Sequence, residues 1–420
     1  MKKILSPYQI KKFTLAVIHS IAFYPAIIAI GFFFLAIGAL YAEENFSFFK
    51  IVAELPFLAV SDVDTARSML TTLAGGIISI MVFTFTMVML VLNLTSTNYS
   101  PRVLPGLISS KPNQIVLGLF LGTISYTITI LSNIDSDYYS FSVPKLALII
   151  NAVAGAACLA GFVYFIHHIS RSIQISNMLV DLHRRTTKVL DHEAEYGNYL
   201  PAKMLPEIGD DNTLIRSNSG YLQALSEKNL VKLAKKHDLI IQIVVTKGMF
   251  VLNGQPVLKA TAPLSDKLKD ELMGCFVFQN EELISQNYLM GIKQITEIVV
   301  KAMSPGINDP GTALQGLNYL IDLFLYLDNV VGHKTIMEDG KFLLIYSKTP
   351  VCNTIRVSLL EILIYGKADL IIVHRMYSGL KLLESRVNTK EVKDCIEEMI
   401  TQVEREIKRG EIKPYIKPFL

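Results

Sequence analysis

The chain has 420 residues, of which 51% are apolar, and its formal net charge is only +3. So small a charge gives no support for nucleic-acid binding. The cysteines form no C-x-x-C pair, so the sequence predicts free thiols and neither a disulfide framework nor a zinc site.

Four apolar stretches are each about long enough to cross the ~30 Å hydrocarbon core of a bilayer, which takes roughly 20 helical residues. They are Leu15–Tyr41, Met69–Leu94, Ile115–Leu131 and Val143–Ile166. The first is much longer than the apolar core of a cleaved signal peptide, so we expect it to be a retained span. No acidic residue lies within any stretch, which argues against a proton-coupled pump or a carboxylate-based ion carrier.

Lysine and arginine gather in three segments: before the first stretch, between the second and third, and after the fourth. The other two connections carry an excess of acidic residues. Because cytoplasmic loops are enriched in Lys and Arg, this pattern predicts that both chain termini lie in the cytoplasm.

A polar residue recurs every seven positions along the second stretch. These residues, here named the polar face, are Thr72, Ser79, Thr86 and Asn93. Seven residues are two helical turns, so the four side chains share one side of the helix. Two interpretations stay open: packing against helices of the same subunit, or lining the pore of an oligomer. Phe83 and Leu90 lie one turn from the polar face and would form a hydrophobic gate in the second case.

Small residues mark the third and fourth stretches. Gly118 and Gly122 share one helical side, as do Ala152, Ala156 and Ala160. Such surfaces let helices approach closely, and we expect this packing within one subunit.

Two histidines, His167 and His168, end the fourth stretch. Adjacent helical residues point about 100° apart, so we expect no shared metal ion. A pH-sensing role is chemically available to them.

The carboxyl-terminal part is expected to be a cytosolic α+β domain. The sequence divides into a four-helix transmembrane domain over 1–170, a connecting helix and linker over 171–212, an α+β module over 213–280 and a mainly helical domain over 281–420. Asn253-Gly254 predicts a hairpin with arms at 250–252 and 256–258, and Asp339-Gly340 predicts another before 342–346. Residues 351–409 are expected to form three helices.

A helix predicted over 288–303 runs into a sharp corner. Pro305 and Gly306 end that helix, Asp309 caps the next one, and Pro310 takes its first turn. The simplest interpretation is a tight helix–loop–helix connection. Alternatively, Asn308 and Asp309 belong to a ligand or interface site, for which Arg102, His167 and His168 are the other candidates. Backbone amides at the start of the second helix could then hold an anion.

No catalytic motif is found. Walker A, G-x-G-x-x-G, G-x-S-x-G and H-E-x-x-H patterns are absent from the sequence, so we expect neither an enzyme nor a cofactor. A membrane enzyme would instead require Arg102, His168 and Asp309 to converge in one cleft.

Several segments resemble a bacterial family of predicted membrane proteins known as domain of unknown function 2254. The segments that carry the resemblance are Ser100-Pro101-Arg102, residues 113–126, Phe165-Ile166-His167-His168, Ser219-Gly220-Tyr221, Ser304–Pro310 and Thr312-Ala313. Gly311 and Met303 depart from the usual Phe and Leu, which affects packing rather than chemistry. The resemblance implies a membrane-spanning amino half and a cytosolic carboxyl half, in a bacterial cytoplasmic (inner) membrane. It implies no established activity.

These observations lead to two functional hypotheses. The first is a homo-oligomeric channel or pore-like protein in the lipid bilayer, passing an ion or small solute along the polar face, with the cytosolic domain assembling and gating the subunits. The alternative is a membrane-anchored sensor or scaffold whose cytosolic domain binds a ligand or partner.

Overall fold

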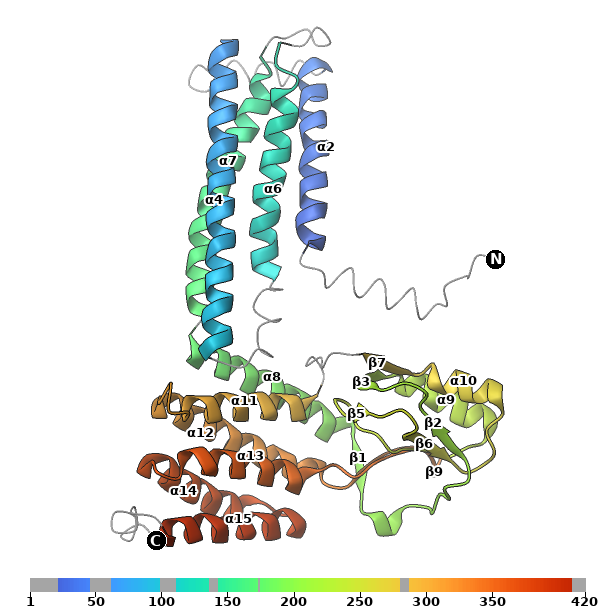
Figure 1. Ribbon diagram of the computed structural model, residues 1–420. Coiled ribbons are helices and arrows are strands. Elements are labelled where there is room, and N and C mark those ends of the chain that lie inside the picture. Colours follow the sequence, from blue (N-terminus) through green and yellow to red (C-terminus); the bar gives the residue numbers. More distant parts are fainter. Residues whose placement is uncertain are drawn as a thin grey trace. The chain divides into compact units, whose positions relative to one another are not determined.

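The computed structural model describes residues 22–45, 62–98, 111–135, 143–172, 174–279 and 287–409. The chain divides into two compact units, Met1–Gln174 and Ile175–Leu420, here called unit 1 and unit 2. Figure 1 shows a bundle of long helices in unit 1 and a mixture of helices and sheets in unit 2.

Within its described residues, unit 1 contains four helices that are long and apolar enough to span a membrane. They are α2 (Phe23–Asn45), α4 (Val63–Asn98), α6 (Lys111–Leu131) and α7 (Lys145–Ser172). Each overlaps one predicted apolar stretch, so the predicted membrane helices are confirmed. The beginning of the first predicted stretch, residues 15–21, lies outside the described residues.

Helix α6 packs against all three of the other helices. Its two glycines face α2: a Cβ atom on Gly118 would lie 3.2 Å from the Cα of Pro25, and one on Gly122 would lie 2.9 Å from the ring of Phe32. Packing within one subunit is therefore confirmed for these glycines. The same expectation was wrong for Ala156 and Ala160, which are exposed, because α7 turns another side toward its neighbours.

Helix α4 buries a single side. Its buried residues are Ala66, Leu70, Ile77, Thr84 and Val91. They recur at intervals of four and seven positions, which is the spacing of one helical face. This side packs against α6 and α7, where a Cβ atom on Gly155 would press on Leu73.

The part of unit 2 that the structure describes contains two sheets. The larger has the strand order β1-β8-β9-β4-β6-β2 and the smaller the order β5-β3-β7. The smaller consists of β5 (Phe250–Val251), β3 (Gly220–Leu225) and β7 (Phe276–Gln279). The larger consists of β1 (Asn198–Leu200), β8 (His333–Glu338), β9 (Lys341–Tyr346), β4 (Ile241–Ile243), β6 (Pro256–Ala260) and β2 (Thr213–Ile215). The strands of this larger sheet come from three of the predicted ranges: β1 from 171–212, β2, β4 and β6 from 213–280, and β8 and β9 from 281–420. Strands β4 and β9 pair in parallel.

The two predicted hairpins have different outcomes. Strands β8 and β9 pair antiparallel around Asp339-Gly340, which confirms that hairpin. The hairpin at Asn253-Gly254 was wrong: the turn is present, with φ of +81° at Gly254, but its arms belong to different sheets. Strand β5 pairs with β3, while β6 pairs with β2 and β4, because each arm finds a partner elsewhere in the chain.

The remaining elements are helical. Those of the helical layer are α8 (Ile175–Tyr196), α11 (Tyr288–Ala302), α12 (Pro310–Leu327), α13 (Val351–Gly366), α14 (Leu370–Arg386) and α15 (Lys390–Arg409). Helices α9 (Glu227–His237) and α10 (Asp266–Met273) accompany the sheets (Figure 1). The last three helices of the layer confirm the expectation for 351–409.

Candidate functional site: the polar face of α4

The polar face of α4 points away from the rest of unit 1. Thr72, Ser79, Thr86 and Asn93 are all exposed. At about 100° per residue, Ser79 lies some 160° around the helix from the buried Ile77, so the polar and buried sides are nearly opposite. Packing inside the same subunit therefore does not explain the polar face. A water route inside one isolated copy of unit 1 does not explain it either.

The hydroxyl groups on this side are satisfied within the helix. Ser79 donates a hydrogen bond to the carbonyl oxygen of Gly75 at 2.9 Å, and Thr86 donates to that of Val82 at 3.0 Å. Such bonds to the carbonyl four residues earlier make a hydroxyl inexpensive in an apolar medium. The polar face can therefore contact either a helix of another molecule or water. In both cases the hydroxyl protons of these two residues keep their hydrogen bonds.

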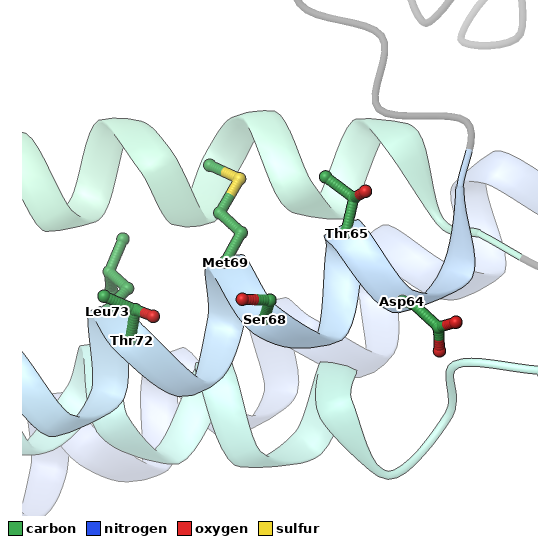
Figure 2. A pocket seen from close by; sticks show the side chains of 6 residues that line it. All are labelled: Asp64, Thr65, Ser68, Met69, Thr72 and Leu73. Atoms are coloured by element: carbon green, nitrogen blue, oxygen red, sulfur yellow. The ribbon is translucent and has the colours of Figure 1, made fainter.

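The polar face continues into a run of small residues. Gly75 and Gly76 are exposed, and a Cβ atom on either would meet no atom within 4 Å. At the start of the polar face, residues of α4 line a hollow, and Figure 2 shows their side chains. The hollow is lined by Asp64, Thr65, Ser68, Met69, Thr72 and Leu73. This side of the helix therefore has room for the close approach of another helix.

The two predicted gate residues lie on the same side of α4. Phe83 and Leu90 follow Ser79 by four and eleven positions, which is about 40° and 20° around the helix. Both are exposed. Phe83 is also fixed by an edge-to-face contact with Phe162 of α7, with ring centroids 5.9 Å apart. Two large apolar side chains thus interrupt the row of hydroxyls.

The predicted ligand or interface residues fall into both units. His167 is exposed on α7, and His168 stacks on Tyr164 with ring centroids 5.8 Å apart. Asn308 and Asp309 belong to unit 2, and Arg102 lies outside the described residues. Among the residues that the structure describes, no group of three or more His, Cys, Asp or Glu side chains is arranged to hold a metal ion.

The loop between α11 and α12 is the tight corner that the sequence predicts. Asp309 caps α12 by accepting a hydrogen bond from the amide of Thr312 at 3.0 Å, and hydrogen bonds from Thr312 lower its pKa. Asn308 takes the left-handed conformation, with φ of +45°. Because the protein's own carboxylate occupies the start of α12, the geometry favours a structural corner over an anion site.

Unit 2 contains a half-buried ionic cluster that the sequence does not reveal. The amino group of Lys334 on β8 lies 2.9 Å from a carboxylate oxygen of Glu193 and 3.1 Å from one of Glu227. Tyr346 donates a hydrogen bond to Glu227 at 2.8 Å. Glu193 and Lys334 are separated by 141 positions in the chain, so no local pattern brings them together.

The charges of this cluster support one another. Burial is the largest single influence on Glu227 and favours its neutral form. Attraction to Lys334 and the hydrogen bonds from Tyr346 and Lys334 together outweigh burial and hold the pKa of Glu227 below its usual value. Burial likewise opposes the charge on Lys334, yet Glu193 and Glu227 raise its pKa. The cluster joins α8, β8, β9 and the start of α9, so we interpret it as a structural tie rather than a catalytic centre.

Glu43 is a buried acidic residue whose role the sequence does not reveal. By position alone it is one residue of an acidic connection. Its carboxylate accepts hydrogen bonds from the amides of Lys145 and Leu146, at 2.8 and 3.1 Å. The end of α2 thereby caps the start of α7, where helix amides have no partner of their own.

Comparisons with known proteins agree with this architecture. A family model described as "predicted membrane protein (DUF2254)" matches residues 18–381. An uncharacterized protein of Mycobacterium bovis is 26% identical over 286 residues, which cover 65% of this chain and 54% of that protein. An uncharacterized protein of Mycobacterium tuberculosis (strain CDC 1551 / Oshkosh) is 25% identical over the same coverage. The chain thus spans about half the length of the curated relatives it matches. No solved structure matches it.

Proposed function

The chain belongs to the DUF2254 family of predicted membrane proteins, and from this premise we propose that it is a homo-oligomeric membrane channel or pore-like protein whose pathway is lined by the polar face of α4. The observation that carries the proposal is the outward direction of that face. A helix that buries one side in its own subunit and turns hydroxyls and glycines outward has a second side suited to a symmetric assembly.

The proposed roles follow from position along α4. Thr72, Ser79 and Thr86 would line the pathway together with Asn93. Phe83 and Leu90, on the same side, would form a hydrophobic constriction that closes by dewetting. None of these six side chains is acidic, so we expect an ion or small solute to pass with weak selectivity. Catalysis and a cofactor form no part of this proposal.

Unit 2 would assemble and gate the subunits from the cytoplasm. The placement of Lys and Arg supports a cytoplasmic position for both termini in a bacterial inner membrane. In this arrangement unit 1 forms the pathway, and unit 2 controls the association of its copies.

The assembly can be tested by cysteine cross-linking. Ser79→Cys in membranes is expected to give disulfide-linked dimers on mild oxidation, because symmetry places the same face of several α4 helices together. Phe85→Cys is the matched control: it is exposed on the same helix, about 120° away from Ser79. If neither variant links beyond the wild-type background, or if both link equally, this arrangement of α4 is refuted.

Conduction needs a separate measurement. Purified protein in liposomes is expected to pass ions, and Ser79→Leu or Thr86→Leu should abolish most of that flux by making the pathway apolar. Thr71→Leu is the matched control, since Thr71 is also exposed and donates to the carbonyl oxygen four residues earlier, yet lies about 80° from Ser79.

The two measurements together separate the competing functions. Wild-type protein that shows no flux under any ionic condition, although its Ser79→Cys variant cross-links, would contradict the channel. Such a result would support a membrane-anchored sensor or scaffold whose unit 2 binds a ligand or partner.

A further inference from the structure

Four large apolar side chains are exposed where α13 meets α14. Ile364 is 65% exposed, Tyr365 51%, Ile371 56% and Leu370 38%. Only three residues, 367–369, separate the two helices. A concentration of apolar surface at a helix corner marks an interaction site rather than ordinary surface composition.

This corner lies at a definite end of the helical layer of unit 2. Ser176, near the start of α8, is hydrogen-bonded to Gln315 in the first half of α12. His183 and Asp322, each seven residues further along its helix, are also hydrogen-bonded. The two helices therefore run in the same direction, with their amino-terminal ends together.

Helix α14 has the same direction. Arg375, in the first half of α14, donates a hydrogen bond to Asn318 in the middle of α12. Near their other ends, the carboxylate of Asp328 accepts hydrogen bonds from the amides of Asn388 and Thr389, just beyond α14. The starts of α8, α12 and α14 thus lie at one end of the layer, and so does the apolar corner that immediately precedes and begins α14.

The short connection between α7 and α8 limits how far the start of α8 can lie from the end of α7. The membrane helix α7 ends at Ser172 and α8 begins at Ile175. Three extended residues span at most about 10 Å. Helix α12 packs against both α8 and α14. Because packed helices lie about 8–10 Å apart, the axis of α14 lies at most about 20 Å from that of α8. These lengths allow the corner to reach the membrane surface from which α7 emerges.

From this juxtaposition we propose that the α13–α14 corner docks on the lipid bilayer, inserting Ile364, Tyr365, Leu370 and Ile371 into its interfacial layer. The chemistry of the corner suits that layer. Tyr365 combines an apolar ring with a polar hydroxyl, as aromatic residues at bilayer interfaces do. Exposed Lys367, between the helices, can keep its amino group among the headgroups.

The acidic neighbours do not oppose this docking. Asp369 is occupied as the cap of α14, where it accepts hydrogen bonds from the amides of Ile371 and Ile372 at 2.9 and 3.1 Å. Glu361 is exposed one turn before Tyr365, at the rim of the apolar group. The inference concerns what this surface of unit 2 binds, and it holds whether or not the protein conducts.

The absence of tryptophan from the chain allows a direct test. In full-length protein reconstituted in liposomes, Tyr365→Trp introduces a single indole at the corner. We expect the emission of this indole to be blue-shifted. Most of the emission should be lost when the lipids carry brominated acyl chains, which quench only on contact. Tyr196→Trp is the matched control: Tyr196 is 70% exposed at the far end of α8, about 32 Å from Ile175 along the helix. Its emission should remain red-shifted and unquenched.

A second variant links the quenching to the corner. Adding Ile364→Glu and Ile371→Glu to Tyr365→Trp should return its quenching to the level of the Tyr196→Trp control, because charged side chains resist insertion. Docking is overturned if Tyr365→Trp is quenched no more than the control or if the two glutamates leave strong quenching unchanged. Blue-shifted but unquenched emission also overturns it, since protein, such as a second copy of this chain, would then cover the corner.

Discussion

Replacing Lys334 with methionine is expected to destabilise unit 2 by about 3–5 kcal/mol. The side chain is mostly buried between Glu193 and Glu227, and its removal leaves two neighbouring carboxylates without their cation. Hydrogen exchange of the β8 and β9 amides in the full-length protein measures this loss locally. The amides should exchange at least about a hundredfold faster than in the wild type.

An exposed ion pair provides the control for this effect. Lys235 pairs with Glu338 on the surface, with about half of each side chain exposed. Lys235→Met should therefore cost less than about 1 kcal/mol. Adding Glu193→Gln and Glu227→Gln to Lys334→Met should restore part of the protection. If Lys334→Met and Lys235→Met lost equal stability, the ionic cluster around Lys334 would not stabilise unit 2.

The effect of Lys334→Met should also depend on pH in a defined direction. Because its pKa is lowered in the folded protein, Glu227 contributes stability above its ordinary pKa and loses it as the pH falls through the lowered value. Lys334, with a raised pKa, contributes fully at neutral pH and loses its contribution only as the pH rises through that raised value. The difference between wild type and variant should be constant near neutral pH and shrink on acidification below about pH 4.

Gly332→Ala is expected to cost about 3 kcal/mol, the sum of steric overlap and backbone strain. Gly332 has φ of +117°, and an added Cβ atom would lie 2.9 Å from the carbonyl oxygen of Leu200 in β1. The obstacle is backbone, so no side-chain rotation relieves it. Faster hydrogen exchange of β1 and a lower melting temperature of unit 2 would report the loss.

A second glycine separates the two contributions to this loss. Gly340 also has a positive φ, of +74°, but an added Cβ atom there would meet nothing within 4 Å. Gly340→Ala should therefore cost only the conformational term, about 1 kcal/mol. If the two variants lost equal stability, close approach to β1 would not be the reason for glycine at 332.

Some features of the candidate site could be predicted from the sequence, and others could not. The seven-residue recurrence of Thr72, Ser79, Thr86 and Asn93 shows that they share one side of a helix, since helical geometry alone decides this. The recurrence does not show whether that side packs against other helices of the same subunit or is exposed on the surface of the helix bundle. The answer depends on where α6 and α7 place their surfaces, which the structure shows to be opposite the polar face.

For the two predicted hairpins, the sequence likewise predicts the turns but not the strand pairing. Both Asn253-Gly254 and Asp339-Gly340 form turns, because their backbone preferences are local. Only the second joins paired strands. Pairing is a competition among all available strands, and β3 is the partner that takes β5.

The sequence by itself determined the four membrane helices, because long apolar runs must satisfy their backbone polar groups internally in lipid. It also determined the corner at Asp309 and Pro310, where capping chemistry is local. Only the tertiary structure decided the outward direction of the polar face, the order of the strands, the tie between Lys334 and Glu193, and the shared end of α8, α12 and α14. These features join residues far apart in the chain, and their energies come from contacts that local patterns do not encode.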